Sequence, residues 1–126
     1  MTSVLAVDDS ASMRQMLAHT LRLSGYDVVE AVDGRDALDK LATHAVQVVI
    51  TDQNMPRMDG LALTRALRAD PQWQTLPVLI LTTEADEATK QAGRAAGATG
   101  WLLKPFDPQR LVQVLRQVAP QQGAPA

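Results

Sequence analysis

Five short apolar segments alternate with longer amphipathic ones along this chain, and that alternation constrains the fold more than any other feature. The apolar segments are Val4–Val7, Tyr26–Val32, Val46–Thr51, Pro77–Leu81 and Gly100–Leu103. The first, third and fourth are continuous apolar runs, which indicates strands buried on both faces, as in a parallel sheet covered by helices. The alternation therefore predicts an α/β fold, a doubly wound five-stranded parallel sheet with five helices.

The intervening segments carry apolar residues at helical spacing. In four of the predicted helices these residues form a stripe that we expect to pack inward. The stripes are Met13, Met16, Leu17 and Leu21 in the first helix, Ala37, Leu38 and Leu41 in the second, Leu63, Ala66 and Leu67 in the third, and Leu111, Val114, Leu115 and Val118 in the last, which starts at Pro108. Gly25 closes the first helix, and the third ends before Pro71. The remaining helix, over residues 84–96 and capped by Gly97, has a stripe of small residues that would bury little area: Ala85, Ala88, Ala92 and Ala95.

Length and composition narrow the function classes. The chain has 126 residues, a net charge of −2 and no cysteine, so we expect one domain with no disulfide and no thiolate site. Its basic residues are scattered, which argues against nucleic-acid binding. The N-terminus does not resemble a signal peptide, and no segment approaches the length needed to span a bilayer. We expect a cytoplasmic monomer with its domain over residues 1–119 and a flexible tail over residues 120–126.

Chemically active side chains stand at the carboxyl ends of four predicted strands. They are Asp8 and Asp9 after the first strand, Asp52 after the third, Thr82 after the fourth and Lys104 after the fifth. In open α/β sheets, ligands bind outside these strand ends. The fold therefore predicts that three carboxylates, one hydroxyl and one ammonium group share a single site.

Such a cluster favours phosphoryl chemistry. Crowded carboxylates repel one another, so the group must bind a proton or a cation. Oxygen ligands without His or Cys select a hard ion, Mg²⁺ or Mn²⁺. With that ion bound the cluster is neutral, a phosphoryl group can approach, and one carboxylate is free to act as the nucleophile.

Each of these residues also has an ordinary structural explanation. Asp52 could close a turn by bonding its own backbone, and Asp8 and Asp9 could cap the first helix. Thr82 could be a hydroxyl at a strand end, and Lys104 a solvated charge before a proline. The placement of all five at one edge of the sheet favours the functional interpretation.

Four motifs resemble the receiver domain of two-component response regulators. They are D-D-S at 8–10, V-V-I-T-D-Q-N-M-P-R-M-D-G at 48–60, L-T-T-E at 81–84 and A-T-G-W-L-L-K-P-F at 98–106. The resemblance extends to about Val118 and implies the flavodoxin-like strand order 2-1-3-4-5. Within the family, the pattern around Trp101 is most similar to stand-alone chemotaxis regulators of the CheY-like type.

The resemblance implies a role for each site residue. Asp52 would accept a phosphoryl group from a sensor histidine kinase, and Mg²⁺ would be held by Asp8 or Asp9, by Asp52 and by the backbone carbonyl of Asn54. Lys104 would pair with the phosphate, and the Lys104–Pro105 bond would be cis. The remaining implied elements are a switch formed by Thr82 and Trp101 and an output face formed by the fourth helix, the fifth strand and the fifth helix.

Several positions depart from the family pattern or tune it. Trp101 stands where the switch aromatic is commonly Tyr or Phe, and a larger ring would restrict an inward rotamer; it could also simply pack in the core. Thr83 replaces a smaller residue common in the family. Asn54 and Glu84 match the chemotaxis type, which implies a short-lived phosphorylated state. His19 and His44 are assigned no role.

The leading hypothesis is a single-domain phosphorylation switch in chemotaxis that binds the flagellar motor switch or another signalling protein, with a phosphatase as a further candidate partner. Alternatives are a phosphorelay or kinase-regulating receiver, and a receiver that binds partners unphosphorylated. An Mg²⁺-dependent aspartyl phosphatase would require a second Asp at the position where this chain has Asn54. A flavodoxin-like FMN binder would need an acid-free loop after the first strand, where Asp8 and Asp9 would repel the phosphate.

Overall fold

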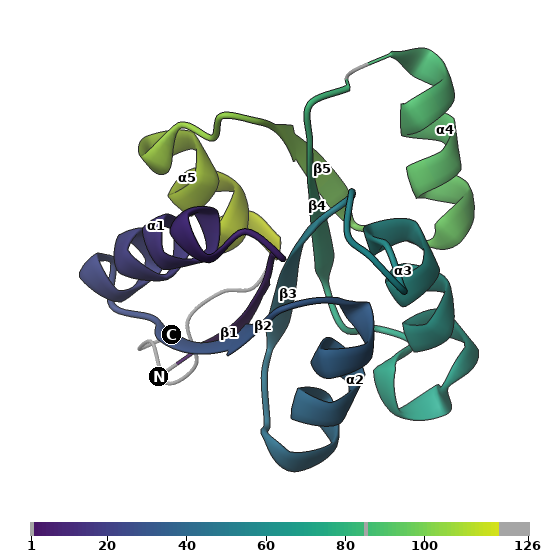
Figure 1. The fold of residues 1–126 in the computed structure, drawn as a ribbon, viewed down its shortest axis with the longest axis horizontal. Coiled ribbons are helices and arrows are strands. Elements are labelled where there is room, and N and C mark those ends of the chain that lie inside the picture. Colours follow the sequence, from purple (N-terminus) through teal and green to yellow (C-terminus); the bar gives the residue numbers. More distant parts are fainter. Residues whose placement is uncertain (1, 85, 119–126) are drawn as a thin grey trace.

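A five-stranded parallel sheet forms the centre of the protein (Figure 1), which we describe from a computed structural model over residues 2–84 and 86–118. The strands lie in the order β2-β1-β3-β4-β5, and every neighbouring pair is parallel. Their bounds are β1 Ser3–Val7, β2 Asp27–Ala31, β3 Val48–Asp52, β4 Val78–Thr82 and β5 Gly100–Leu103. The predicted fold class and the strand order implied by the resemblance are both confirmed.

Helices cover both faces of the sheet, as continuous apolar strands require. In Figure 1, α1 and α5 lie on one side of the sheet and α2, α3 and α4 on the other. The helices are α1 Ala11–Leu23, α2 Gly34–Thr43, α3 Gly60–Ala69, α4 Glu87–Ala96 and α5 Pro108–Val118. A 3₁₀ turn over Pro71–Trp73, which the sequence analysis does not predict, follows α3.

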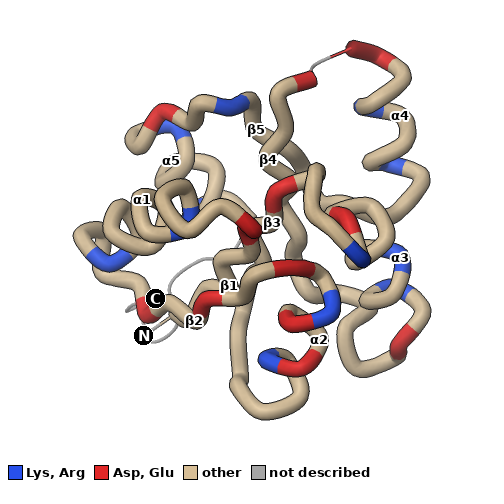
Figure 2. The backbone as a smooth tube through the Cα atoms, viewed as in Figure 1, with Lys and Arg blue, Asp and Glu red and all other residues tan. Residues whose placement is uncertain are grey.

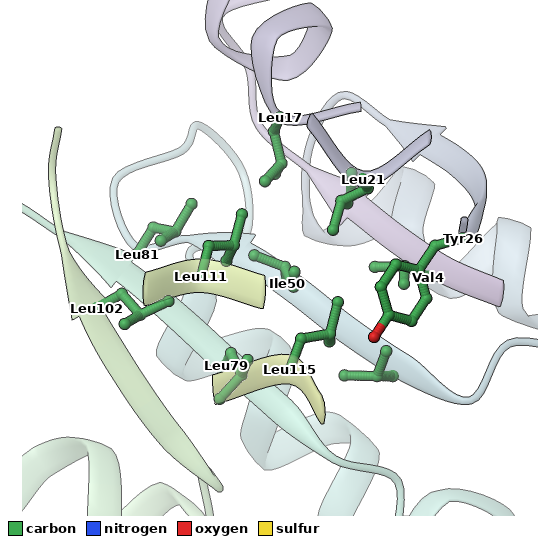
Figure 3. Packing of buried hydrophobic residues seen from close by; sticks show 12 residues of the cluster. Val4, Leu17, Leu21, Tyr26, Ile50, Leu79, Leu81, Leu102, Leu111 and Leu115 are labelled. Carbon is green, nitrogen blue, oxygen red and sulfur yellow. The ribbon is translucent and has the colours of Figure 1, made fainter. Parts of the chain in front are cut away.

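Two apolar clusters fill the layers on either side of the sheet. The cluster beneath α1 and α5, drawn in Figure 3, joins Leu17, Leu21, Leu111 and Leu115 to Ile50 in the centre of the sheet. The cluster beneath the other helices includes Leu5, Val49, Leu63, Leu67 and Ile80. Alternate strand residues thus enter opposite clusters, and the sheet is anchored so that its carboxyl edge is held in place.

Side-chain caps fix where most helices begin, and glycines fix where two of them end. An Asp side chain accepts a hydrogen bond from a backbone N–H in the first turn of each of α2, α3 and α4, and a Ser side chain does so in α1. The four capping residues are Ser10, Asp33, Asp59 and Asp86. Gly25 and Gly97 have φ of 91° and 97°, the left-handed conformation that ends a helix. The predicted roles of these two glycines are confirmed.

Some predicted boundaries differ from the structure. β3 begins at Val48 instead of Val46 and includes Asp52, whose backbone pairs with Leu81 of β4. α4 begins at Glu87 instead of Glu84, because Asp86 is its cap. Residues 120–126, predicted as a tail, lie outside the described residues. In the described ranges, no helix is long and apolar enough to cross a membrane.

The predicted inward stripe of α4 is wrong for two of its residues, while a third, Ala92, is half-buried. Ala88 and Ala95 are exposed, whereas Gly93 and Ala96 are the buried residues of this helix; Ala85 lies outside the described residues. The helix is rotated relative to the predicted stripe because the large Trp101 ring on β5 packs against it at Gly93. Met16 of α1, also predicted to face inward, is 53% exposed.

Candidate functional site

The carboxyl edge of the sheet brings together the side chains that the sequence analysis selected. Asp52 and Thr82 are the last residues of β3 and β4, Asp8 directly follows β1 and Lys104 directly follows β5. The strand register places Asp52 opposite Leu81 and Thr82 opposite Leu103. Figure 2 shows acidic segments at the ends of β1 and β3 and a basic position between β5 and α5.

Three carboxylates form the centre of the site. Oxygens of Asp8, Asp9 and Asp52 all lie within 4.8 Å of one another. Asp8 is 1% exposed and Asp52 is 5% exposed, whereas Asp9 is open to solvent. The backbone N–H of Ser10 donates to Asp8 Oδ1 at 2.9 Å, which fixes the orientation of the Asp8 carboxylate.

Lys104 extends into this cluster from the end of the edge strand β5. Its Nζ lies 2.7 Å from Asp52 Oδ1 and 3.4 Å from Asp8 Oδ2. Its backbone N–H donates to the carbonyl of Thr82 at 2.8 Å, which ties the end of β5 to the end of β4. The Lys104–Pro105 peptide bond is cis, the isomer that the resemblance implied.

Burial, together with the crowding of charge, shifts the protonation equilibria of Asp52 and Lys104. Burial raises the pKa of Asp52; the hydrogen bond from Lys104 opposes this shift, and the Asp8 charge adds to it. Burial lowers the pKa of Lys104, but the hydrogen bonds and charges of Asp52 and Asp8 together outweigh burial, so that the net shift is upward. Lys104 is thus held as a cation, while the ionised form of Asp52 is disfavoured.

The site carries an uncompensated negative charge that a cation would neutralise. Three carboxylates facing one ammonium group leave two negative charges unpaired. The donor atoms are oxygens in close proximity, the ligand type that hard divalent cations prefer. Asp8, Asp9 and Asp52 therefore fit a divalent cation.

The loop between β3 and α3 forms one wall of the site. Asn54, two residues beyond Asp52, is exposed and lines an open groove of about 270 Å³ together with Thr82 and Glu84. The base of the loop is closed by the Gly60 N–H donating to the Gln53 carbonyl at 3.0 Å. The groove gives a bound group access to the end of β4.

An ion pair anchors the far side of this loop, which the sequence analysis missed. Arg57 Nε donates to Asp33 Oδ2 at 2.9 Å, and the Gly34 N–H donates to the Met58 carbonyl at 3.3 Å. The Asp36 N–H and then the Arg57 guanidinium hold the pKa of Asp33 below its usual value. Arg57 has φ of 66°, a conformation that L-residues rarely adopt, so this loop is held under backbone strain.

The two predicted switch residues lie on the same face of neighbouring strands. Trp101 pairs with Ile80, two residues before Thr82, and the Thr82 hydroxyl accepts from the Glu84 N–H at 3.1 Å. Trp101 and Thr82 line one small cavity beneath α4. Thr83 is exposed beside the site.

The two histidines are exposed on the surface. His19 lies on α1 and His44 is the C-terminal cap of α2, where its Nδ1 lies 3.1 Å from the Lys40 carbonyl. Neither belongs to the carboxylate cluster.

Comparison with known proteins identifies the family. The family model of the response regulator receiver domain matches residues 4–116. The chemotaxis protein CheY1 of Helicobacter pylori (strain J99) is 42% identical over 117 residues, which cover 91% of this chain and 94% of that protein. The structure of chemotaxis protein CheY4 of Vibrio cholerae has a TM-score of 0.90 and 50% identity, covering 94% of this chain and 98% of that one.

A second similar structure holds a metal ion. It is the receiver domain of sensor histidine kinase PA1611 from Pseudomonas aeruginosa, solved with a magnesium ion coordinated in its active-site cleft. Its TM-score is 0.84 at 27% identity, over 92% of this chain and 95% of that one. Together with the fold and the acidic cluster, these matches show that the chain belongs to the response regulator receiver domain family of two-component signalling and is of the CheY type.

Proposed function

We propose that this protein is a phosphorylation switch in which Asp52 accepts a phosphoryl group from a sensor histidine kinase. The arrangement of Asp52 carries the proposal: a buried carboxylate at a strand end, in contact with Lys104 and close to two further carboxylates. A groove beside it opens to solvent. The Asp52 carboxylate is thus fixed in place, and the solvent-exposed Asp9 beside it marks the side from which a phosphodonor would approach.

The reaction forms one bond and breaks one bond. An Asp52 carboxylate oxygen attacks the phosphorus of a phosphohistidine, the P–N bond breaks, and its electron pair returns to the imidazole. Lys104 and Thr82 hold the oxygens of the transferring group, because positioning and charge stabilisation are most of what phosphoryl transfer requires. The product is an aspartyl phosphate.

A divalent cation completes the charge balance of the site. Asp8, Asp9 and Asp52, with the backbone carbonyl of Asn54, would hold Mg²⁺ or Mn²⁺, with Asp9 as a direct side-chain ligand. When bound, the ion would neutralise the two unpaired negative charges of the cluster, so that a phosphoryl group could approach Asp52. Magnesium in the cleft of the similar Pseudomonas aeruginosa receiver supports this assignment.

The signal leaves through the face formed by α4, β5 and α5. A groove on this face is lined by Lys90, Trp101, Phe106 and Arg110, and Leu103 is 51% exposed beside it. Exposed apolar surface with basic side chains is suited to a protein partner. Because the similar proteins from Helicobacter pylori and Vibrio cholerae are chemotaxis proteins, we propose that the partner belongs to chemotaxis, with the flagellar motor switch as the leading candidate.

Intact-mass measurement after incubation with Mg²⁺ and acetyl phosphate tests this proposal. We expect a gain of one phosphoryl group on the wild type, lost in Asp52→Asn and in excess EDTA. Asp39→Asn makes the same chemical change on the exposed face of α2. It is the matched control and should still gain the adduct. No adduct on the wild type, even with a histidine kinase as donor, would contradict the proposed function.

A further inference from the structure

Gly93 occupies a position where glycine is unfavourable for helix formation. It lies in the interior of α4 and is buried against the sheet. Glycine inside a helix is less stable than alanine because it gives up more backbone freedom. Unlike Gly25 and Gly97, Gly93 does not have a positive φ, so its backbone conformation does not require glycine.

The space around Gly93 does require it. A Cβ atom at this position would lie 2.3 Å from Cζ3 of Trp101 and 2.8 Å from Cε3, closer than real Cβ contacts. Both carbons belong to the six-membered ring of the indole, the part that makes tryptophan larger than tyrosine or phenylalanine. The missing side chain at residue 93 therefore provides the space that this ring fills.

The ring lies between the candidate site and the outer surface. Trp101, Gly93, Thr82 and Thr89 line the same small cavity beneath α4. Trp101 also borders the surface groove that contains Lys90 and Leu103. A change at Thr82 can therefore reach the surface of α4 and β5 through the position of one ring.

We propose that Gly93 is a positioning residue for Trp101, and that the two residues form a matched pair holding the indole beneath α4 beside Thr82. A residue larger than glycine at position 93 is compatible with a smaller ring at position 101 but not with tryptophan. The coupling of this pair to phosphorylation rests on the proposed function, whereas its packing does not.

Urea unfolding of the wild type, Gly93→Ala, Trp101→Tyr and the double variant tests the packing in the absence of metal and phosphodonor. Gly93→Ala should lower the unfolding midpoint when residue 101 is Trp. The same change should raise the midpoint in the Trp101→Tyr background, because alanine is then the better helix former. Ala95→Gly, on the exposed face of α4, is the control and should lower the midpoint equally in both backgrounds. A Gly93→Ala that raises the midpoint in both backgrounds would overturn the proposal.

Fluorescence tests the positioning itself. In a Trp73→Phe background Trp101 is the single tryptophan, and Gly93→Ala should make it more accessible to acrylamide quenching. Phosphorylation, verified by intact mass, should change Trp101 emission in this background and should change it much less after Gly93→Ala. Unchanged quenching, or an unchanged emission response on a protein that carries the adduct, would contradict the positioning role.

These two experiments separate the inference from the proposed function. If no adduct forms on either protein, the proposed function fails, and the sign reversal in urea and the acrylamide quenching, which need no adduct, decide whether Gly93 and Trp101 are a matched pair.

Discussion

Within β3, the strand passes from a fully apolar environment to a charged one in two residues. Val48, Val49 and Ile50 are completely buried among aliphatic side chains. Asp52, at the end of the same strand, is almost as deeply buried but lies beside two other carboxylates and one ammonium group. The interior and the carboxyl edge of one sheet therefore differ in chemistry while sharing the same depth.

This difference separates stability from function. Burial of aliphatic side chains in the interior lowers the free energy of the folded state. Buried like charges at the edge raise it, unless a ligand compensates them. An edge of this kind is destabilised by itself and gains stability from a bound cation, which is a common compromise at functional sites.

The interior should be the more sensitive region to truncation. Ile50→Ala removes a fully buried side chain and should reduce the free energy of unfolding by about 2–5 kcal/mol, measured by urea titration. Met16→Ala, on the exposed face of α1, is the control and should change it by less than about 0.5 kcal/mol. Equal losses in both variants would mean that the described core does not carry the stability.

Removing the Lys104 ammonium group from this edge should also lower the free energy of unfolding. Lys104→Met leaves the buried carboxylates unpaired and should lower stability in EDTA by about 3 kcal/mol at neutral pH. Because the pKa of Lys104 is raised above 10.5, this contribution is complete below that pH and is lost only as the pH rises through the folded pKa. Lys90→Met removes the same charge from α4, outside the cluster, and a loss of similar size there would argue against the cluster as the cause.

Removing one negative charge from this edge should instead raise the free energy of unfolding. Asp52→Asn should raise the free energy of unfolding in EDTA by about 1 kcal/mol at neutral pH, and saturating Mg²⁺ should reduce the difference by stabilising the wild type. Since burial chiefly raises the pKa of Asp52 above 3.8, the folded protein binds a proton there more tightly than the unfolded chain. The gain should therefore be absent below that pH and grow as the pH rises through the folded pKa. Asp39→Asn should show neither effect.

An effect of similar size is expected in the loop that borders the edge. Arg57→Ala removes the pair with Asp33 and keeps a strained positive φ, whereas Arg57→Gly removes the pair but relieves the strain. The glycine variant should therefore be more stable than the alanine variant by about 1 kcal/mol in thermal unfolding. A glycine variant no more stable than the alanine variant would show that the backbone strain at residue 57 is absent in solution.

The sequence was sufficient for the parts of the molecule that follow local rules. Continuous apolar runs predicted the strands, because only a doubly covered sheet buries both of their faces. Placement of Asp52 and Lys104 at strand ends then followed from the topology, since parallel strands bring their carboxyl ends to one edge.

Features that depend on distant partners could not be predicted in this way. The inward face of α4 was misjudged because it is set by packing against the Trp101 ring on β5, which the alanine spacing within the helix does not reveal. A glycine inside a predicted helix was the available signal for Gly93. The Arg57–Asp33 pair joins residues that are 24 positions apart, and nothing in their local sequence indicates it.

Locating the phosphoryl group on the chain tests the central claim most directly. Borohydride reduces an aspartyl phosphate to homoserine, so protein treated with acetyl phosphate and Mg²⁺, then reduced and digested, can be mapped by peptide mass spectrometry. We predict homoserine at residue 52 and aspartate retained at residues 8 and 9. Homoserine at residue 8 or 9 with residue 52 unchanged would contradict the account, because the nucleophile would then be one of the carboxylates assigned to the cation.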